Sequence, residues 1–271
     1  MIRGTQITYI GHATILIEMD GVRVLTDPLL RDRIGHLRRH SLRLGIPLRE
    51  RIRRLNPNNR PAETLWYHSV DAVLVSHLHW DHFDVLSLRM LGYGMRLIVP
   101  QGAAKQLRRR EFRRVEEVRP GDTFEIGSTT VEVTPAAHNG FRPPFGPVTP
   151  CLGYILHGGH RVYFPGDTDV FPEMVDLGKD LDVALVPIWG WGPSLGNGHM
   201  DPRRAAEALT LLRPRVAVPI HWGTFYPLGL GLMRAGFITL PPYAFAHHAA
   251  RLAPEVEVKI VEPGERLQLD G

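Results

Sequence analysis

The stretch Ser76-His77-Leu78-His79-Trp80-Asp81-His82 decides how this 271-residue sequence is interpreted. It follows a short apolar run that is typical of a buried strand, and it precedes residues that we expect to be helical. Because extended residues two positions apart point to the same side, His77 and His79 can reach one metal ion together. Asp81 and His82 follow the turn into the helix and can reach a second ion. Imidazole and carboxylate groups are ligands of zinc, and they also suit iron or manganese.

Three further candidate ligands come directly after later predicted strands. His138 lies in the segment TPAAHNG, Asp167 in YFPGDTD and His221 in VPIHWG. A single histidine at such a place is more often a structural or surface residue. Behind the first motif, however, the three form an ordered set at strand ends, and together they predict a two-metal site.

The chain resembles the metallo-β-lactamase superfamily over nearly its whole length. The metal motifs carry that resemblance. Five motifs resemble one branch of the superfamily, which includes the ascorbate-phosphate lactonases and the N-acyl-phosphatidylethanolamine phospholipase D enzymes. They are Gly11-His12-Ala13-Thr14, Leu25-Thr26-Asp27-Pro28, Ser76–His82, Gly166-Asp167-Thr168-Asp169 and His199-Met200-Asp201-Pro202. The resemblance does not imply a substrate.

The resemblance implies an α/β fold, a four-layer αββα sandwich with the site at one edge between two sheets. It also implies how the ligands divide between two zinc ions per chain, with manganese as the alternative metal. One ion would take His77, His79 and His138, the other would take Asp81, His82 and His221, and Asp167 would bridge the two. Asp27 is either a hydrogen-bond partner of a ligand imidazole or a turn residue before a proline.

Two metal ions roughly 3.5–4 Å apart can share a water and lower its pKa enough to give hydroxide at neutral pH. The sequence therefore predicts a metal-dependent hydrolase that uses a metal-bridging hydroxide on a phosphodiester or ester-like small molecule. Asp81 is expected to serve the reacting water. His199 is expected to donate to the oxyanion or the leaving group, unless it is only a neighbour of a helix cap. His12 either contacts the site or belongs to a turn.

Three other functions remain open. Within the same chemistry, the protein could be a lactonase of sugar phosphates. It could process nucleic acids, but members of the superfamily that do so usually carry a large inserted domain, so a nucleic-acid partner is not expected. It could also bind metal without catalysis, which a complete ligand set argues against.

Composition bounds the remaining possibilities. Hydrophobic residues make up 44% and charged residues 22% of the chain, which excludes wholesale disorder. No apolar run approaches the ~20 residues of a membrane helix, and the first residues lack the apolar core of a signal peptide. The single cysteine, Cys151, excludes an internal disulfide. We expect one domain over residues 1–271 and a cytoplasmic location; the oligomeric state is not predicted.

An arginine-rich excursion interrupts this domain at about residues 31–65. Residues 31–54 hold nine arginines against Asp32 and Glu50, a local net charge of +7 in a chain whose total is +4. Apolar residues near helical spacing, broken by Gly45 and Pro47, suggest a solvated amphipathic cap; they are Leu37, Leu44, Leu48, Ile52 and Leu55. The alternative is a patch for anionic phosphates, either on a lipid-like substrate or in a peripheral contact with a membrane.

Two local signals are specific. Asp20-Gly21 between two apolar runs predicts a β-hairpin. Asp201 followed by Pro202 predicts the start of a helix over residues 202–212, with the aspartate as its N-cap.

Overall fold

Two seven-stranded sheets form the centre of the computed structural model, which describes residues 4–39, 70–192, 195–228 and 236–270. The first sheet has the order β17-β1-β2-β3-β6-β7-β8, built from β1 (Thr5–Gly11), β2 (Thr14–Met19), β3 (Val22–Thr26), β6 (Ala72–Leu74), β7 (Arg96–Pro100), β8 (Arg114–Val118) and β17 (Arg266–Leu269). The second has the order β16-β14-β13-β12-β11-β10-β9, built from β9 (Thr123–Ile126), β10 (Thr129–Pro135), β11 (Leu152–His157), β12 (Arg161–Phe164), β13 (Val183–Pro187), β14 (Val216–Ile220) and β16 (Glu257–Val258). A small third sheet joins β15 (Phe225–Pro227), β5 (Leu37–Arg39) and β4 (Arg33–Ile34).

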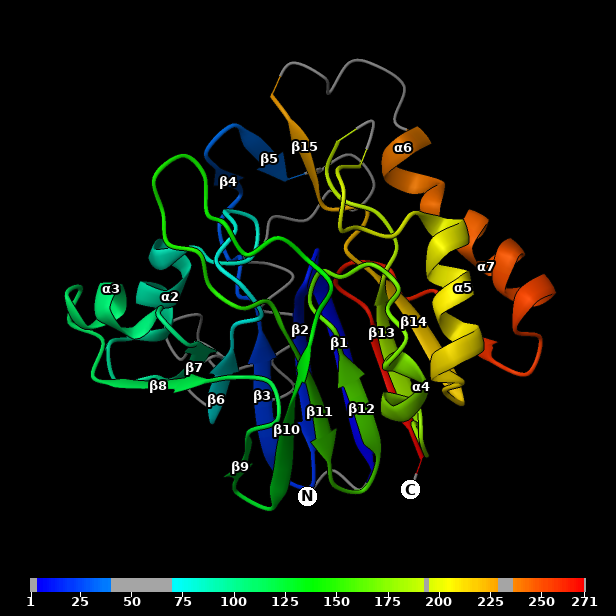
Figure 1. Ribbon diagram of the computed structural model, residues 1–271, viewed down its shortest axis with the longest axis horizontal. Helices are drawn as coiled ribbons and strands as arrows, with labels where there is room; N and C mark the ends of the chain where they lie inside the picture. Colours follow the sequence, from blue (N-terminus) through cyan, green and yellow to red (C-terminus); the bar gives the residue numbers. More distant parts are fainter. Residues whose placement is uncertain (1–3, 40–69, 193–194, 229–235, 271) are drawn as a thin grey trace.

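Helices cover the outer faces of the two large sheets. They are α2 (Val85–Leu91), α3 (Ala104–Arg108), α4 (Met174–Leu177), α5 (Pro202–Leu212), α6 (Gly236–Thr239) and α7 (Pro241–Leu252). Figure 1 shows α2 and α3 on one side of the sheets and α5 and α7 on the other. The predicted αββα sandwich is therefore confirmed.

The burial pattern explains why these segments form central strands. In β2, Ile15 and Ile17 belong to the core shared by the two sheets, whereas Leu16 belongs to the core under α2 and α3. The same alternation holds in β6, where Leu74 faces the other sheet and Val73 faces the helices. Strands buried on both faces have continuous apolar sequences, and such runs predict buried strands from the sequence alone.

The topology brings distant segments to one edge of the sandwich. β3 and β6 are parallel in the first sheet, and β12, β13 and β14 are parallel in the second. The residues that leave the carboxyl ends of such strands gather at a common edge, where α/β proteins commonly build their sites. Backbone hydrogen bonds join the two sheets there, from Leu152 N to Ser76 O (2.9 Å) and from His221 N to His12 O (2.8 Å).

Both local signals are confirmed. Asp20 and Gly21 have positive φ angles of 52° and 81° and connect the antiparallel strands β2 and β3. The Asp201 carboxylate caps α5 by accepting a hydrogen bond from Arg204 N at 2.8 Å, with Pro202 in the first turn.

The arginine-rich excursion is described only in part, because residues 40–69 lie outside the described residues. Leu37, which the sequence placed near helical spacing, lies instead in β5. Arg31 forms a two-pronged ion pair with Asp84 at 2.8 Å. Within the described ranges, no helix is both long and apolar enough to cross a membrane.

Replacing the cap tests the start of α5. Asp201→Ala removes the acceptor for Arg204 N and is expected to lower the free energy of unfolding by about 1 kcal/mol. Asp201→Asn keeps an acceptor oxygen, so it should lie within a few tenths of a kcal/mol of the parent chain. Urea unfolding measures both, and equal stability of the alanine variant and the parent would contradict the cap.

Candidate metal centre

All seven predicted ligands meet at this edge of the sandwich. All but Asp167 form two groups, and His12 joins the second of them. Within each group the candidate ligand atoms lie within 4.8 Å of one another. The first group is His77, His79 and His138; the second is Asp81, His82 and His221 with His12. Asp167 lies beside the second group, its carboxylate 3.1 Å from His82 Nε2 and 3.3 Å from His221 Nε2.

In each ring of the first group, one nitrogen forms a hydrogen bond outside the group. This bond determines which nitrogen keeps a lone pair that can bind a metal. His79 Nε2 faces Phe141 O at 2.9 Å, and His138 Nδ1 faces Gly198 O at 2.7 Å. A carbonyl oxygen only accepts, so both of these nitrogens carry the proton. The remaining nitrogens, His79 Nδ1 and His138 Nε2, lie 3.0 Å apart with a lone pair on each.

The third ring of this group follows the same rule. The hydroxyl of Ser76 donates to Asp27 at 2.5 Å and can therefore accept from His77 Nδ1, which lies 2.9 Å away. His77 Nε2 is left buried and without a hydrogen-bond partner among the described residues. Burial lowers the pKa of all three rings, to about 4 for His138, so they are neutral at pH 7.

The second group combines imidazoles with carboxylates. His221 Nδ1 donates to Trp189 O at 2.7 Å, and His82 Nδ1 donates to Asp27 at 2.7 Å. Their Nε2 atoms lie 3.0 Å apart. Burial opposes a charge on His82, but the Asp167 and Asp81 carboxylates outweigh it and raise the pKa of that ring well above its usual value. The two carboxylates therefore favour a positive charge at this place, which a metal cation would also supply.

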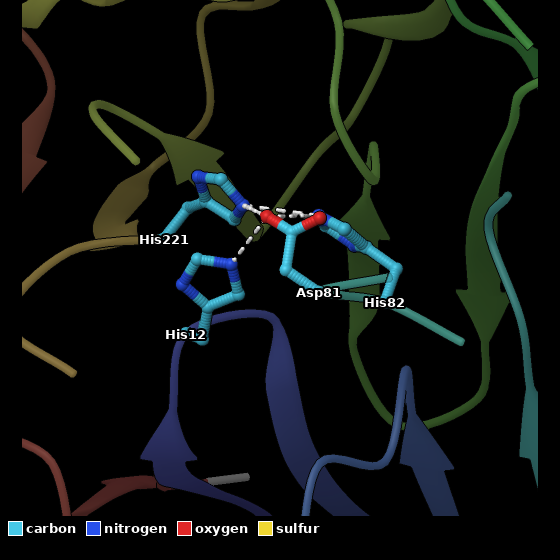
Figure 2. A group of neighbouring side chains, drawn as sticks. All are labelled: His12, Asp81, His82 and His221. Carbon is cyan, nitrogen blue, oxygen red and sulfur yellow. Dashed lines mark hydrogen bonds and ion pairs between the residues drawn. The ribbon is translucent and has the colours of Figure 1, made fainter. Parts of the chain in front are cut away.

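His12 holds the Asp81 carboxylate in place. Figure 2 shows one oxygen of that carboxylate pointing toward the rings of His12 and His221, with His82 on the other side of the carboxylate. His12 Nε2 lies 3.0 Å from Asp81 Oδ2, and burial lowers the pKa of His12 to about 3. Neighbouring histidines keep the pKa of Asp81 well below its usual range despite its burial, so Asp81 is ionised. The neutral His12 ring therefore donates a hydrogen bond from Nε2–H to the carboxylate. His12 lies in the turn between β1 and β2 and also contacts the site, so both interpretations of the sequence apply.

Asp27 connects the two groups. One of its oxygens accepts from both Ser76 Oγ and His82 Nδ1, and the other accepts from Ser76 N at 2.7 Å. Through Ser76 it orients His77 of the first group, and directly it orients His82 of the second. Such outer partners set the tautomer and direction of metal-ligating imidazoles. Ser76 was not predicted, although its place directly before His77 was a signal.

Three residues of the centre have a strained backbone. The φ angles of His12, Asp27 and His221 are 60°, 32° and 64°, in the left-handed region that residues other than glycine rarely adopt. Gly166 also has a positive φ, and a Cβ there would lie 2.5 Å from Ser76 Cβ. Only glycine therefore allows Asp167 to come this close to the first sheet. Strain of this kind is characteristic of functional sites.

This donor set fits metal ions. Three neutral imidazoles present lone pairs to one place where the described residues supply no hydrogen atom. Beside them, the buried carboxylates of Asp81 and Asp167 need a compensating positive charge. A divalent cation satisfies both requirements, and the outer hydrogen bonds are those expected of ligands.

His199 lies at the open side of the centre. Its Nε2 is 3.3 Å from Asp167 Oδ2, its Nδ1 is 3.2 Å from Gly196 O, and its side chain is 24% exposed. Burial opposes a charge on this ring, but the contact with Asp167 outweighs it and raises the pKa of His199 to about 9. The ring can therefore hold a proton where a solute can reach it.

Arg142 fastens the loop that follows β10 onto the metal motif. Its guanidinium lies 4.0 Å over the Trp80 ring, and Trp80 Nε1 donates to Pro143 O at 3.0 Å. The same loop supplies Phe141 O, the acceptor that orients His79. No sequence signal indicated Arg142, because its partners are more than fifty positions away in the chain.

Two other residues near the centre have structural roles. Cys151 is buried, and burial raises the pKa of its thiol to about 12, so it is not an activated nucleophile. Trp189 packs against the core, and its carbonyl orients His221.

Comparisons with known proteins show the family and the fold of this chain. The profile of a family described as "Beta-lactamase superfamily domain" matches residues 22–222. A UPF0173 metal-dependent hydrolase of Methanopyrus kandleri is 30% identical over 96% of this chain and 98% of its own length. An N-acyl-phosphatidylethanolamine-hydrolyzing phospholipase D 1 of Caenorhabditis elegans is 32% identical over 82% of this chain and 64% of its own. Among solved structures, the metallo hydrolase Igni18 of Ignicoccus hospitalis aligns with a TM-score of 0.71 at 24% identity, over 98% of this chain and 99% of that one, which supports the fold.

Removing the Asp27 carboxylate tests how the two groups are connected. Asp27→Ala leaves His82 Nδ1 and Ser76 without their acceptor, and losing such a partner typically weakens metal binding 10–100-fold. We expect a loss of this size in zinc affinity, measured by competition with a chromogenic chelator. Asp176→Ala, at an exposed aspartate of α4, is the matched control and should bind as the parent does. Unchanged affinity in Asp27→Ala would show that Asp27 is only a turn residue.

Proposed function

The chain belongs to the metallo-β-lactamase superfamily and is a metal-dependent hydrolase by family, and from this premise we propose that it hydrolyses a phosphodiester or ester-like small molecule at a centre of two metal ions. We propose zinc as the metal, with manganese as the alternative, because imidazole nitrogens outnumber carboxylates in the donor set. The cytoplasmic location stays a prediction.

The facing lone pairs of the first group carry this proposal. His79 Nδ1 and His138 Nε2 lie 3.0 Å apart, and both rings are neutral. Two lone pairs at that distance repel unless a cation lies beside them. His77, His79 and His138 would hold one ion, Asp81, His82 and His221 the other, and Asp167 would bridge them. A bound metal pair supplies a water of lowered pKa and polarises a substrate oxygen.

The chain's own residues provide the remaining parts of the reaction. Asp81, whose carboxylate is held by His12, belongs to the second group and can accept a proton from the attacking water. His199 lies beside Asp167 at the exposed side of the centre and can pass a proton to the leaving-group oxygen. No side-chain nucleophile is required.

The substrate class rests on one relative. The similar Caenorhabditis elegans enzyme is named for hydrolysing a phospholipid, N-acyl-phosphatidylethanolamine. The bond broken by a phospholipase D is a phosphodiester, and an anionic diester suits a cationic metal centre. On this ground we favour a phosphodiester, including a lipid-like one, over the lactone of a sugar phosphate.

Turnover of two substrate types tests the proposal. We expect the chain to hydrolyse bis(p-nitrophenyl) phosphate, to lose this activity in chelator and to recover it with zinc or manganese. A panel of lactones is assayed beside it, and His82→Ala serves as the control for contaminating phosphodiesterases. Turnover of lactones alone would favour the lactonase, and no turnover of either substrate by metal-loaded protein would contradict a hydrolase of this class.

A variant of His199 tests the proton donor. General acid catalysis is typically worth 10²–10⁴-fold, so His199→Ala should lower kcat at least about tenfold while metal content stays unchanged. Elemental analysis and steady-state kinetics on one preparation separate the possible roles. A higher KM with kcat kept would indicate a substrate contact, and reduced metal content would indicate a ligand. Full activity with full metal would make His199 a bystander.

A further inference from the structure

A loop with exposed apolar side chains stands beside the metal centre. Phe145 and Val148, in the loop after β10, are 96% and 75% exposed, and Trp80 of the metal motif is 54% exposed. Single exposed apolar residues are ordinary, but several at one place mark an interaction surface. This loop is not loosely attached, because Arg142 and the Trp80–Pro143 hydrogen bond hold its base.

A dense cluster of cations occupies α3 and the residues after it. Residues 105–114 carry six cations against the one acid Glu111, a net charge of +5, and all seven charged side chains are exposed. The cations are Lys105, Arg108, Arg109, Arg110, Arg113 and Arg114. Lys105, Arg108 and Arg109 line an open depression of about 610 Å³. The acid in its lining, Glu117, is occupied by the backbone N–H groups of Gly102 and Ala104.

The loop and the cations adjoin each other. Thr149, at the end of the loop, lies against Gly102 near the start of α3, where an added Cβ would be 3.6 Å from the threonine methyl group. Arg110 is close enough to Arg142 for its charge to act with burial in lowering the pKa of Arg142 to about 10. We call the combination the docking surface: Trp80, Phe145, Val148, Lys105 and Arg108–Arg110.

We propose that the docking surface binds the anionic surface of a phospholipid bilayer. The cations would meet lipid phosphates while the apolar side chains enter the region between headgroups and acyl chains, the combination by which peripheral proteins bind membranes. A second copy of the chain is disfavoured, because two surfaces of net positive charge repel each other. A nucleic acid would pair with the arginines but would leave Phe145 and Val148 in water.

The docking surface lies close to the metal centre, so membrane binding would bring the centre to a lipid-like substrate. Phe141, in the same loop, orients the candidate ligand His79, so a bilayer at the loop would lie beside the metal centre. A lipid-like substrate would then reach the centre from the membrane. The binding itself does not rest on the proposed hydrolase activity, and no residue of the docking surface belongs to the arginine-rich excursion at about residues 31–65.

Sedimentation with vesicles tests the proposal without turnover. The full chain is mixed with vesicles of phosphatidylcholine alone or with 30% phosphatidylglycerol, at low salt and at ~0.15 M salt. Two variants alter the surface, Phe145→Ser/Val148→Ser and Arg108→Glu/Arg109→Glu. Their matched controls lie on α4, α5 and α7, on the opposite side: Val175→Ser/Leu252→Ser and Arg203→Glu/Arg251→Glu. Residues 31–54 are unchanged in every variant.

We expect binding to the anionic vesicles that weakens as salt rises and is much lower on phosphatidylcholine alone. Each arginine near a membrane contributes about fivefold, so the Arg108→Glu/Arg109→Glu variant should bind at least about tenfold more weakly. Phe145→Ser/Val148→Ser should also lose at least about fivefold, and both controls should bind as the parent does. Failure to sediment with anionic vesicles, or binding that both surface variants retain, would overturn the proposal. Stronger binding to single-stranded RNA, lost only in the arginine variant, would do so as well.

Discussion

The rest of the site depends on two imidazole rings whose orientation is set by hydrogen bonds to backbone carbonyl groups. In that orientation the lone pairs of the two rings face each other. Phe141 O and Gly198 O take the protons of His79 and His138, and the two remaining nitrogens lie 3.0 Å apart. No rotation of a single ring relieves this contact without breaking a hydrogen bond to the backbone. The two lone pairs therefore repel each other, and a bound cation would remove this repulsion. A proton does not take that role, because burial lowers the pKa of both rings.

Each oriented ring takes its hydrogen-bond partner from a different part of the chain. The sandwich is the arrangement that brings these parts together. Strand ends of both sheets meet at one edge, where Asp27 orients His82 and Trp189 orients His221. This arrangement requires an unusual backbone at His12, Asp27 and His221, and it requires glycine at position 166. The hydrophobic core offsets the cost of that strain, as expected of a scaffold that holds a preorganised centre.

The residues of the candidate centre could be predicted because they follow apolar runs, and because parallel strands deliver their following residues to a common edge. The four-layer fold followed from the resemblance that those motifs carried. Arg142 and the role of His12 could not be predicted, since their contacts join segments that only the folded chain brings together. β8 and β17 have no such signal, because edge strands rich in charged and polar residues, such as Arg114–Val118, lack an apolar run.

The most direct test of this account is the number of zinc ions that the metal-stripped chain binds. The chain is equilibrated with excess zinc, freed of unbound metal on a desalting column and measured by elemental analysis against protein concentration. About two ions per chain are expected, falling to about one when His79 and His138 are both replaced by alanine and the chain still folds. One ion or none in the parent chain would contradict a centre built from two donor groups.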